Sequence, residues 1–282
     1  MSHPLPAARA ALPQAARGEW AGLRGALCAE WTKLRTVPGT IWLLVATIAA
    51  TVAVSAAATA ATSCPPGIAC AVDTAKLSLT GVEFGQAVVA ILAVLAISTE
   101  YSTGMIRTTL TAVPRRSAVL AAKAAIVGGL VLAAGTIGVA GSLLAGRLIL
   151  PGRGFTAARG FRVLSLADGP VLRAAAGSVL YLALIALLSL GIAASVRDSA
   201  AAIGVVLGLL YLAPIIAAVV AGNPHWQQRI ERYAPMNAGL AIQATTGLHS
   251  LPISPWGGLG VLAAWAAAAL LAGGLLLRLR DA

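Results

Sequence analysis

The chain has 282 residues, of which 59% are hydrophobic and only 10% are charged, and its formal net charge is +11. Mean hydropathy is +0.89, and uncharged runs close to or above the roughly 20 residues that cross a bilayer recur along the sequence. An ordinary soluble domain is therefore excluded. No alternating barrel pattern is present, and a backbone in lipid must satisfy its own hydrogen bonds, so we expect an all-α polytopic membrane protein.

The excess of positive charge is spread over the short segments between apolar runs. This placement favours contact with anionic lipid headgroups over a nucleic-acid surface, because a nucleic-acid site gathers its basic residues on one face. We therefore expect membrane lipids, and no nucleic acid, among the partners of the chain.

Residues 1–20 are expected to form a flexible cytoplasmic tail, and residues 21–282 a single membrane domain. Between Ala21 and Thr36 an apolar stripe with spacings of 4, 4 and 3 lies on a basic segment, formed by Leu23, Leu27, Trp31 and Leu34. This pattern is typical of a helix that lies in the membrane surface. A frayed basic tail is the alternative.

Windows of about 19 residues give six candidate spans. They cover residues 41–62, 84–101, 124–145, 174–196, 200–221 and 257–277. The second is short unless it continues through "STEY", and in that case Glu100 is buried near a membrane face.

The distribution of Lys and Arg predicts the orientation. Five basic residues precede the first span and only Lys76 lies between the first and second, which favours a cytoplasmic amino terminus. With six spans the carboxyl terminus is then cytoplasmic too. The loop between the third and fourth spans works against this rule, because it carries Arg147, Arg153, Arg159, Arg162 and Arg173.

Two further loops have recognisable patterns. Cys64 and Cys70 flank "PPGIA" in the first outer loop, where they could form a disulfide if the loop faces an oxidising compartment, or remain two thiols. The loop from Gly222 to Trp256 contains amphipathic pieces such as "HWQQRIERY", which suggest short helices at the outer face. An unstructured loop is the alternative.

Motifs for catalysis are not found in the sequence. There is no phosphate loop, G-x-x-x-x-G-K-[ST], so ATP hydrolysis by this chain is not expected, and neither a cofactor nor a metal site is predicted. His3, His225 and His249 lie far apart in the sequence. Glu83 and Glu100 stand at span ends, which supports a proton-coupled carrier only weakly.

The segment Ser98–Lys123, "STEYSTGMIRTTLTAVPRRSAVLAAK", is too short for a domain and too patterned for a simple linker. It has an acidic residue at the end of a span, a glycine break, a short segment from Met105 to Leu110, and a basic pair after Pro114. Such an element could receive force from a cytoplasmic partner. The apolar side chains of the segment could then fill a groove on that partner. A solvated connector is the alternative.

This segment resembles the first cytoplasmic loop of type-2 ATP-binding-cassette (ABC) permeases from high-GC bacteria. The pattern "E-Y-x-x-G-x-x-R-x-x-L" followed by "P-R" and a Lys is carried by Glu100, Tyr101, Gly104, Arg107, Leu110, Pro114, Arg115 and Lys123. The stretches "AEWTKLRT" and "LADGPVLRAAAGSVLYLALIALLSLGIAASVRDSAAAI" resemble the surface helix and the fourth and fifth spans of that family. The Arg-rich stretch "GRLILPGRGFTAARGFR" departs from its pattern.

The resemblance implies six spans, a cytoplasmic coupling helix, short outer helices before the last span, and two permease copies on two separate ATPase subunits. It implies a permease of the bacterial plasma membrane that exports a hydrophobic or amphipathic substrate. Coupling to the ATPase would involve Glu100, Tyr101, Gly104, Arg107, Leu110, Pro114, Arg115 and Arg116. An ion-gradient-driven secondary carrier, or a non-transporting immunity or sensory subunit, are the alternatives.

Overall fold

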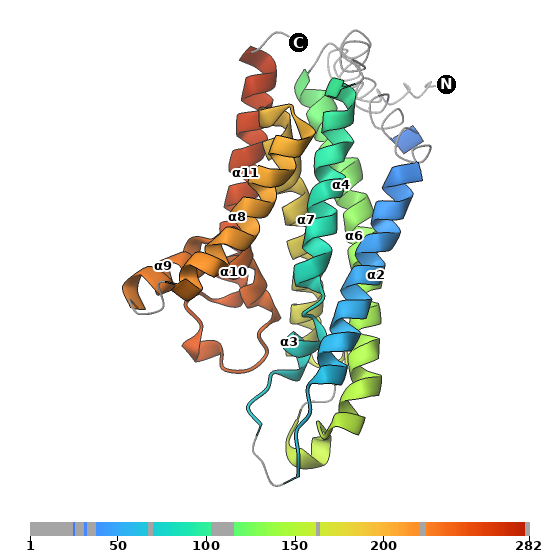
Figure 1. Ribbon diagram of the computed structural model, residues 1–282, viewed down its shortest axis with the longest axis vertical. Coiled ribbons are helices and arrows are strands. Elements are labelled where there is room, and N and C mark those ends of the chain that lie inside the picture. The colour runs from blue at the N-terminus through green and yellow to red at the C-terminus, as the bar shows by residue number, and fades with distance from the viewer. Residues whose placement is uncertain are drawn as a thin grey trace, which may run out of the picture.

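The computed structural model describes residues 25, 31–32, 38–66, 70–102, 116–161, 164–219 and 224–279, and within these ranges all regular structure is helical. Six helices are long and apolar enough to cross a membrane, and successive ones run in opposite directions (Figure 1). They are α2 (Pro38–Ala61), α4 (Val82–Ser102), α6 (Arg116–Ile149), α7 (Gly169–Val196), α8 (Ser199–Val219) and α11 (Pro255–Leu279). The expected all-α polytopic membrane fold is confirmed.

The span boundaries differ most from expectation at α6, and α4 decides between two alternatives. α4 continues through "STEY" to Ser102, so the longer of the two alternatives holds. α6 has 34 residues and begins at Arg116 rather than Ala124, because charged residues at a helix end do not interrupt its backbone hydrogen bonds. At about 1.5 Å per residue α6 is about 51 Å long, well beyond the about 30 Å hydrocarbon core.

Short helices connect the spans at one end of the bundle. There α3 (Thr74–Ser78), η1 (Leu150–Arg153) and η2 (Ala157–Arg159) lie at the bottom of Figure 1, and we call this the disulfide end. The opposite end, where α4 stops and α6 starts, is called the α4–α6 end. Between α8 and α11 the chain forms α9 (Pro224–Tyr233), α10 (Pro235–Leu240), η3 (Ala241–Gln243) and η4 (Leu248–Ser250). The prediction of short helices in this segment is confirmed.

α7 is the central helix of the bundle and packs against α4, α6, α8 and α11. Its side chains Tyr181, Leu182, Ile185 and Leu188 are fully buried.

α2, by contrast, buries its hydroxyl side chains and exposes its apolar ones. Thr47, Thr51 and Thr59 each donate a hydrogen bond to the carbonyl four residues earlier, so these three buried hydroxyls are satisfied within the helix. An outer face that includes Ile41, Trp42 and Val45 suits a lipid environment.

Glycines allow a close helix crossing between α7 and α11. A Cβ built on Gly191 would lie 2.4 Å from the backbone carbon of Ala269, and one on Gly273 would lie 2.7 Å from the Gly191 oxygen. Neither position tolerates a side chain without moving a backbone, so the two helices meet backbone to backbone. Gly204 on α8, in contrast, has nothing within 4 Å of its added Cβ.

Several predicted residues lie outside the described part of the chain. Trp31 and Thr32 are helical and Trp31 is 48% exposed. Arg116 is the first residue of α6. The rest of the predicted surface helix and coupling segment lies outside the described residues, including Leu23, Leu27, Leu34, Gly104, Arg107, Leu110, Pro114 and Arg115.

Candidate functional site

A buried ion pair joins α4 to α6 at the α4–α6 end. The Lys123 Nζ lies 3.1 Å from Glu100 Oε1, and the two side chains are only 3% and 4% exposed. Burying two charges in a region of low dielectric is costly unless each offsets the other with good geometry. The pair therefore fixes the distance between the last turn of α4 and the second turn of α6.

The local sequence explains why Glu100 reaches the interior. α4 continues as a regular helix through Thr99, whose hydroxyl donates to the Leu95 carbonyl at 2.8 Å and which stays on the exposed face. Glu100 is the next residue, about 100° further around the helix, and so it faces α6. Lys123 is buried on the facing side of α6, with its ammonium at the carboxylate.

A second contact ties α4 to the turn between α7 and α8. The Arg197 guanidinium carbon lies 5.4 Å from the centre of the Tyr101 ring, a distance at which a cation and an aromatic face attract. Arg197 ends α7 in the left-handed region at φ +65°, and its N–H donates to the Ala193 carbonyl at 3.0 Å. Asp198 then begins α8 by accepting a hydrogen bond from the Ala201 N–H at 2.7 Å.

These contacts bring together three of the elements that meet at this end. We call Glu100, Tyr101, Lys123 and Arg197 the clamp cluster. The ion pair thus joins the two helices that residues 103–115 connect in the sequence. α4 is therefore tied to α6 by the ion pair and to the α7–α8 turn by the contact of Tyr101 with Arg197.

The sequence had singled out Glu100, Tyr101 and Lys123 as members of one motif, and the structure brings the three to one place. Arg197 was not predicted as a site residue. Its only sequence signal was a single arginine followed by an aspartate in a very short turn between two apolar runs. The partner of such a residue depends on helix packing, which periodicity does not give.

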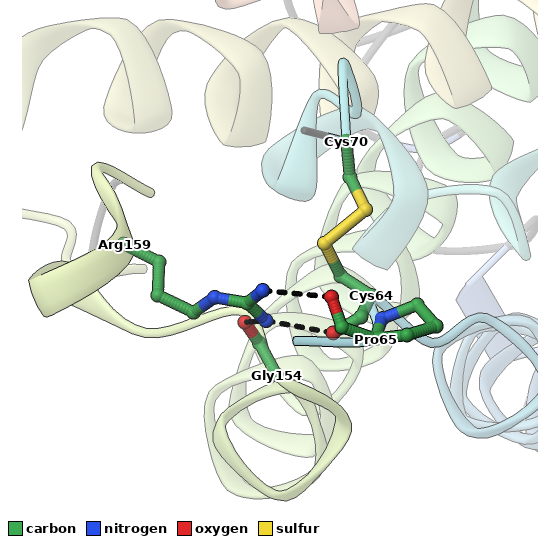
Figure 2. The surroundings of a disulfide bond; sticks show 5 residues. All are labelled: Cys64, Pro65, Cys70, Gly154 and Arg159. Carbon is green, nitrogen blue, oxygen red and sulfur yellow. Dashed lines mark hydrogen bonds between the residues drawn. A yellow bond between two sulfur atoms is a disulfide. The ribbon is translucent and has the colours of Figure 1, made fainter. Parts of the chain in front are cut away.

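At the opposite end a disulfide joins Cys64 to Cys70, whose Cα atoms are 6.1 Å apart. Of the two alternatives for these cysteines, the bonded one is present. Figure 2 shows Arg159 beside the bond: its guanidinium donates to the carbonyls of Cys64 at 2.7 Å and Pro65 at 2.8 Å. The Cys64 N–H donates in turn to the Arg153 carbonyl at 2.9 Å. The Arg-rich loop is thereby fastened to the loop between α2 and α3.

Asp73 holds the segment between α10 and α11 at the same end. One carboxylate oxygen caps α3 through the N–H groups of Ala75 and Lys76 and also accepts from the Thr245 hydroxyl at 2.7 Å. The other accepts from the N–H groups of Thr245 at 2.5 Å and Thr246 at 3.0 Å. Next to these residues, Arg173 of α7 donates to the Ala244 carbonyl.

We expect the Asp73 contact to make this end sensitive to acid. Burial raises the pKa of Asp73, but the hydrogen bonds from Thr245, Lys76 and Thr246 outweigh it and hold the pKa below the ordinary 3.8. The stabilisation is therefore complete above that ordinary value and is lost as pH falls through the lowered pKa of the folded state. Limited proteolysis around residues 244–251 should accelerate only in that acidic range.

Asp73→Asn should accelerate the same cleavage already at neutral pH, by a loss of roughly 1–3 kcal/mol of local stability. Thr245→Val removes one donor, and its effect should not add to that of Asp73→Asn, because both break the same network. Additive effects, or an acid transition that survives in the Asp73→Asn variant, would contradict the assignment.

Buried polar side chains also link the short helices to the spans in the interior. Tyr181 donates to the Gln86 amide oxygen, joining α7 to α4. The Gln86 amide nitrogen contacts Met236 Sδ of α10 at 3.2 Å, and Gln243 donates to the Ser178 hydroxyl at 3.1 Å. These bonds seat α10 and η3 against the core of the bundle.

No family model matches this sequence, and no curated protein matches it either.

Proposed function

We propose that the chain is the membrane-spanning permease subunit of an ABC exporter in the bacterial plasma membrane, driven by ATP that a separate ATPase subunit hydrolyses. The observation that carries the proposal is the buried Glu100–Lys123 ion pair. It joins the last turn of α4 to the second turn of α6, the two helices on either side of residues 103–115, whose sequence resembles the coupling loop of that family.

The clamp cluster gives this connection a mechanical path into the bundle. Movement of residues 103–115 displaces α4 and α6 together through the ion pair, and the Tyr101–Arg197 contact transmits it to the α7–α8 turn. α7 packs against four of the other spans, so a shift of its end rearranges the bundle as a whole. A second copy of the permease completes the assembly, and the apolar spans favour a hydrophobic or amphipathic substrate.

The proposal places the α4–α6 end and both termini in the cytoplasm. The Cys64–Cys70 disulfide supports this orientation, because disulfides persist in oxidising compartments and are rare in the cytosol. In a Cys28→Ser variant of the whole chain, a membrane-impermeant maleimide should label intact cells only after an impermeant reductant opens the bond. Labelling that requires permeabilised cells would reverse the orientation.

Purification in mild detergent from the native host, with mass spectrometry of the bound chains, tests the function. We expect a soluble chain with a phosphate loop to copurify in fixed stoichiometry, and its ATPase activity to depend on the permease. Reversing the charge of Arg107, Arg115 and Arg116 together should abolish this association.

Arg197→Gly offers a variant that leaves the association intact. Glycine adopts the left-handed turn at position 197 without cost, while the contact with Tyr101 is lost. Loss of about 1 kcal/mol of coupling should lower permease-stimulated ATPase activity about fivefold with the partner still bound. Purification without an ATPase, together with transport that survives ATP depletion but stops with an ionophore, would replace the proposal by a secondary carrier.

A further inference from the structure

An apolar groove of about 500 Å³ lies between α6 and α11 at the α4–α6 end. Its walls come from the first turns of α6 and the last turns of α11, and its lining includes Leu120, Ala121, Ala124, Leu271, Gly274 and Arg278. The clamp cluster occupies a different face of α6, since Lys123 points into the bundle.

The groove forms because α11 packs far more extensively on α7 than on α6. The backbone contact at Gly191 and Gly273 fixes α11 against α7. On the other side, an added Cβ on Gly274 would find its nearest atom, Leu120 Cδ2, at 3.6 Å, which is an ordinary contact distance. A single methyl group therefore fits between Gly274 and Leu120, and the open space of the groove lies over this pair.

The dimensions of the groove match one leaflet of a bilayer. From Leu270 to Arg278 the wall on α11 covers eight residue steps, or about 12 Å at 1.5 Å per residue. Half of the hydrocarbon core is about 15 Å. Arg278 is exposed in the last turn of α11 and so stands where headgroup phosphates lie, whereas Leu271, which is 75% exposed, stands where acyl chains lie.

We propose that this groove binds an anionic phospholipid of the leaflet at the α4–α6 end. One acyl chain fills the space over Ala121 and Gly274, and the headgroup phosphate pairs with the Arg278 guanidinium. The positive charge favours an anionic lipid over a zwitterionic one of equal chain length. This site does not depend on the transport activity proposed above, because it needs only the membrane and this chain.

The test uses the whole chain in nanodiscs that contain equal amounts of phosphatidylglycerol and phosphatidylcholine with identical acyl chains. After release into detergent, native mass spectrometry measures how much of each lipid remains bound. Wild-type protein should retain phosphatidylglycerol in preference. Arg278→Gln should reduce that preference about fivefold, which corresponds to one headgroup charge. Gly274→Leu should reduce the retention of both lipids, because leucine occupies the groove.

Two matched variants control for general effects. Arg147→Gln removes an exposed arginine from the last turn of α6 at the other end, and Gly260→Leu adds the same side chain to α11 where nothing lies within 4 Å. Both should retain lipid as the wild type does. Gly274→Ala, which fits the 3.6 Å contact, keeps the test valid if the leucine variant fails to fold.

Three results would overturn the proposal. The first is equal retention of the two lipids by the wild type. The second is an unchanged preference in Arg278→Gln. The third is a Gly274→Leu variant that keeps its lipid but changes from a larger to a smaller oligomer, which would show that a second copy covers the groove.

Discussion

Replacing Lys123 with methionine should destabilise the protein by about 3–5 kcal/mol, because the Glu100 carboxylate then stays buried without the lysine charge. The apparent unfolding temperature of the detergent-solubilised chain should fall accordingly. Glu100→Gln should have a similar effect, since it leaves the ammonium of Lys123 buried near a membrane face.

The double variant Glu100→Gln/Lys123→Met separates stability from function. Removing both charges leaves a neutral pair of similar volume, which in buried sites is often as stable as the ion pair. We therefore expect the unfolding temperature to recover while permease-stimulated ATPase activity stays low, because the ends of residues 103–115 are no longer held together. A double variant as unstable as the single ones would contradict the buried pair, and full ATPase stimulation would contradict its role in coupling.

Gly191→Ala should strongly destabilise the crossing of α7 and α11, although it adds only one methyl group. The new Cβ would lie 2.4 Å from the Ala269 carbonyl carbon and 2.5 Å from the Leu270 nitrogen, and neither backbone atom can move aside without displacing α11. Overpacking of this kind costs about 1–3 kcal/mol and more where backbones meet. Thermal unfolding of the detergent-solubilised variant, followed by its elution profile, measures the loss.

Gly204→Ala provides the comparison on α8. Nothing lies within 4 Å of its added Cβ, and alanine is the better helix former by roughly 0.5–1 kcal/mol, so this variant should unfold at or slightly above the wild-type temperature. Equal losses in the two variants would show that helix propensity or the membrane environment, and not the α7–α11 crossing, determines the effect.

Hydropathy predicted all six spans because each is long, nearly uncharged and unmistakable in a 19-residue window. It failed at the start of α6, where Lys123 was read as the boundary of the span. Lys123 lies inside the helix, since its charge is neutralised by Glu100 from a different span. A 19-residue hydropathy window does not include both Glu100 and Lys123, because the two residues are 23 positions apart and meet only through the packing of α4 on α6.

The arginines of the loop between α6 and α7 were noted in the sequence, but what they contact could not be predicted from it. They looked like an exception to the positive-inside rule. Arg159 and Arg173 donate hydrogen bonds to backbone carbonyls of other loops. They therefore hold these loops together, a role that a count of charges on each side of the membrane does not reveal. The close approach at Gly191 and Gly273 was equally hidden, because glycines are frequent in this chain and several of them, such as Gly204, have nothing near an added Cβ. Only the crossing itself distinguishes them.

The fastening of Arg159 to the carbonyls of Cys64 and Pro65 has a consequence for how sequences of this kind can diverge. Every residue type carries a carbonyl, so the accepting positions place almost no demand on side-chain identity, whereas the donor must present a planar fork of N–H groups. Substitutions at position 65 should be nearly neutral and those at position 159 should not. In such a contact only the donor side chain is constrained, so positions 159 and 65 should not change together among related sequences. A comparison of sequences would then show that the arginine matters but would not identify the carbonyls that it binds.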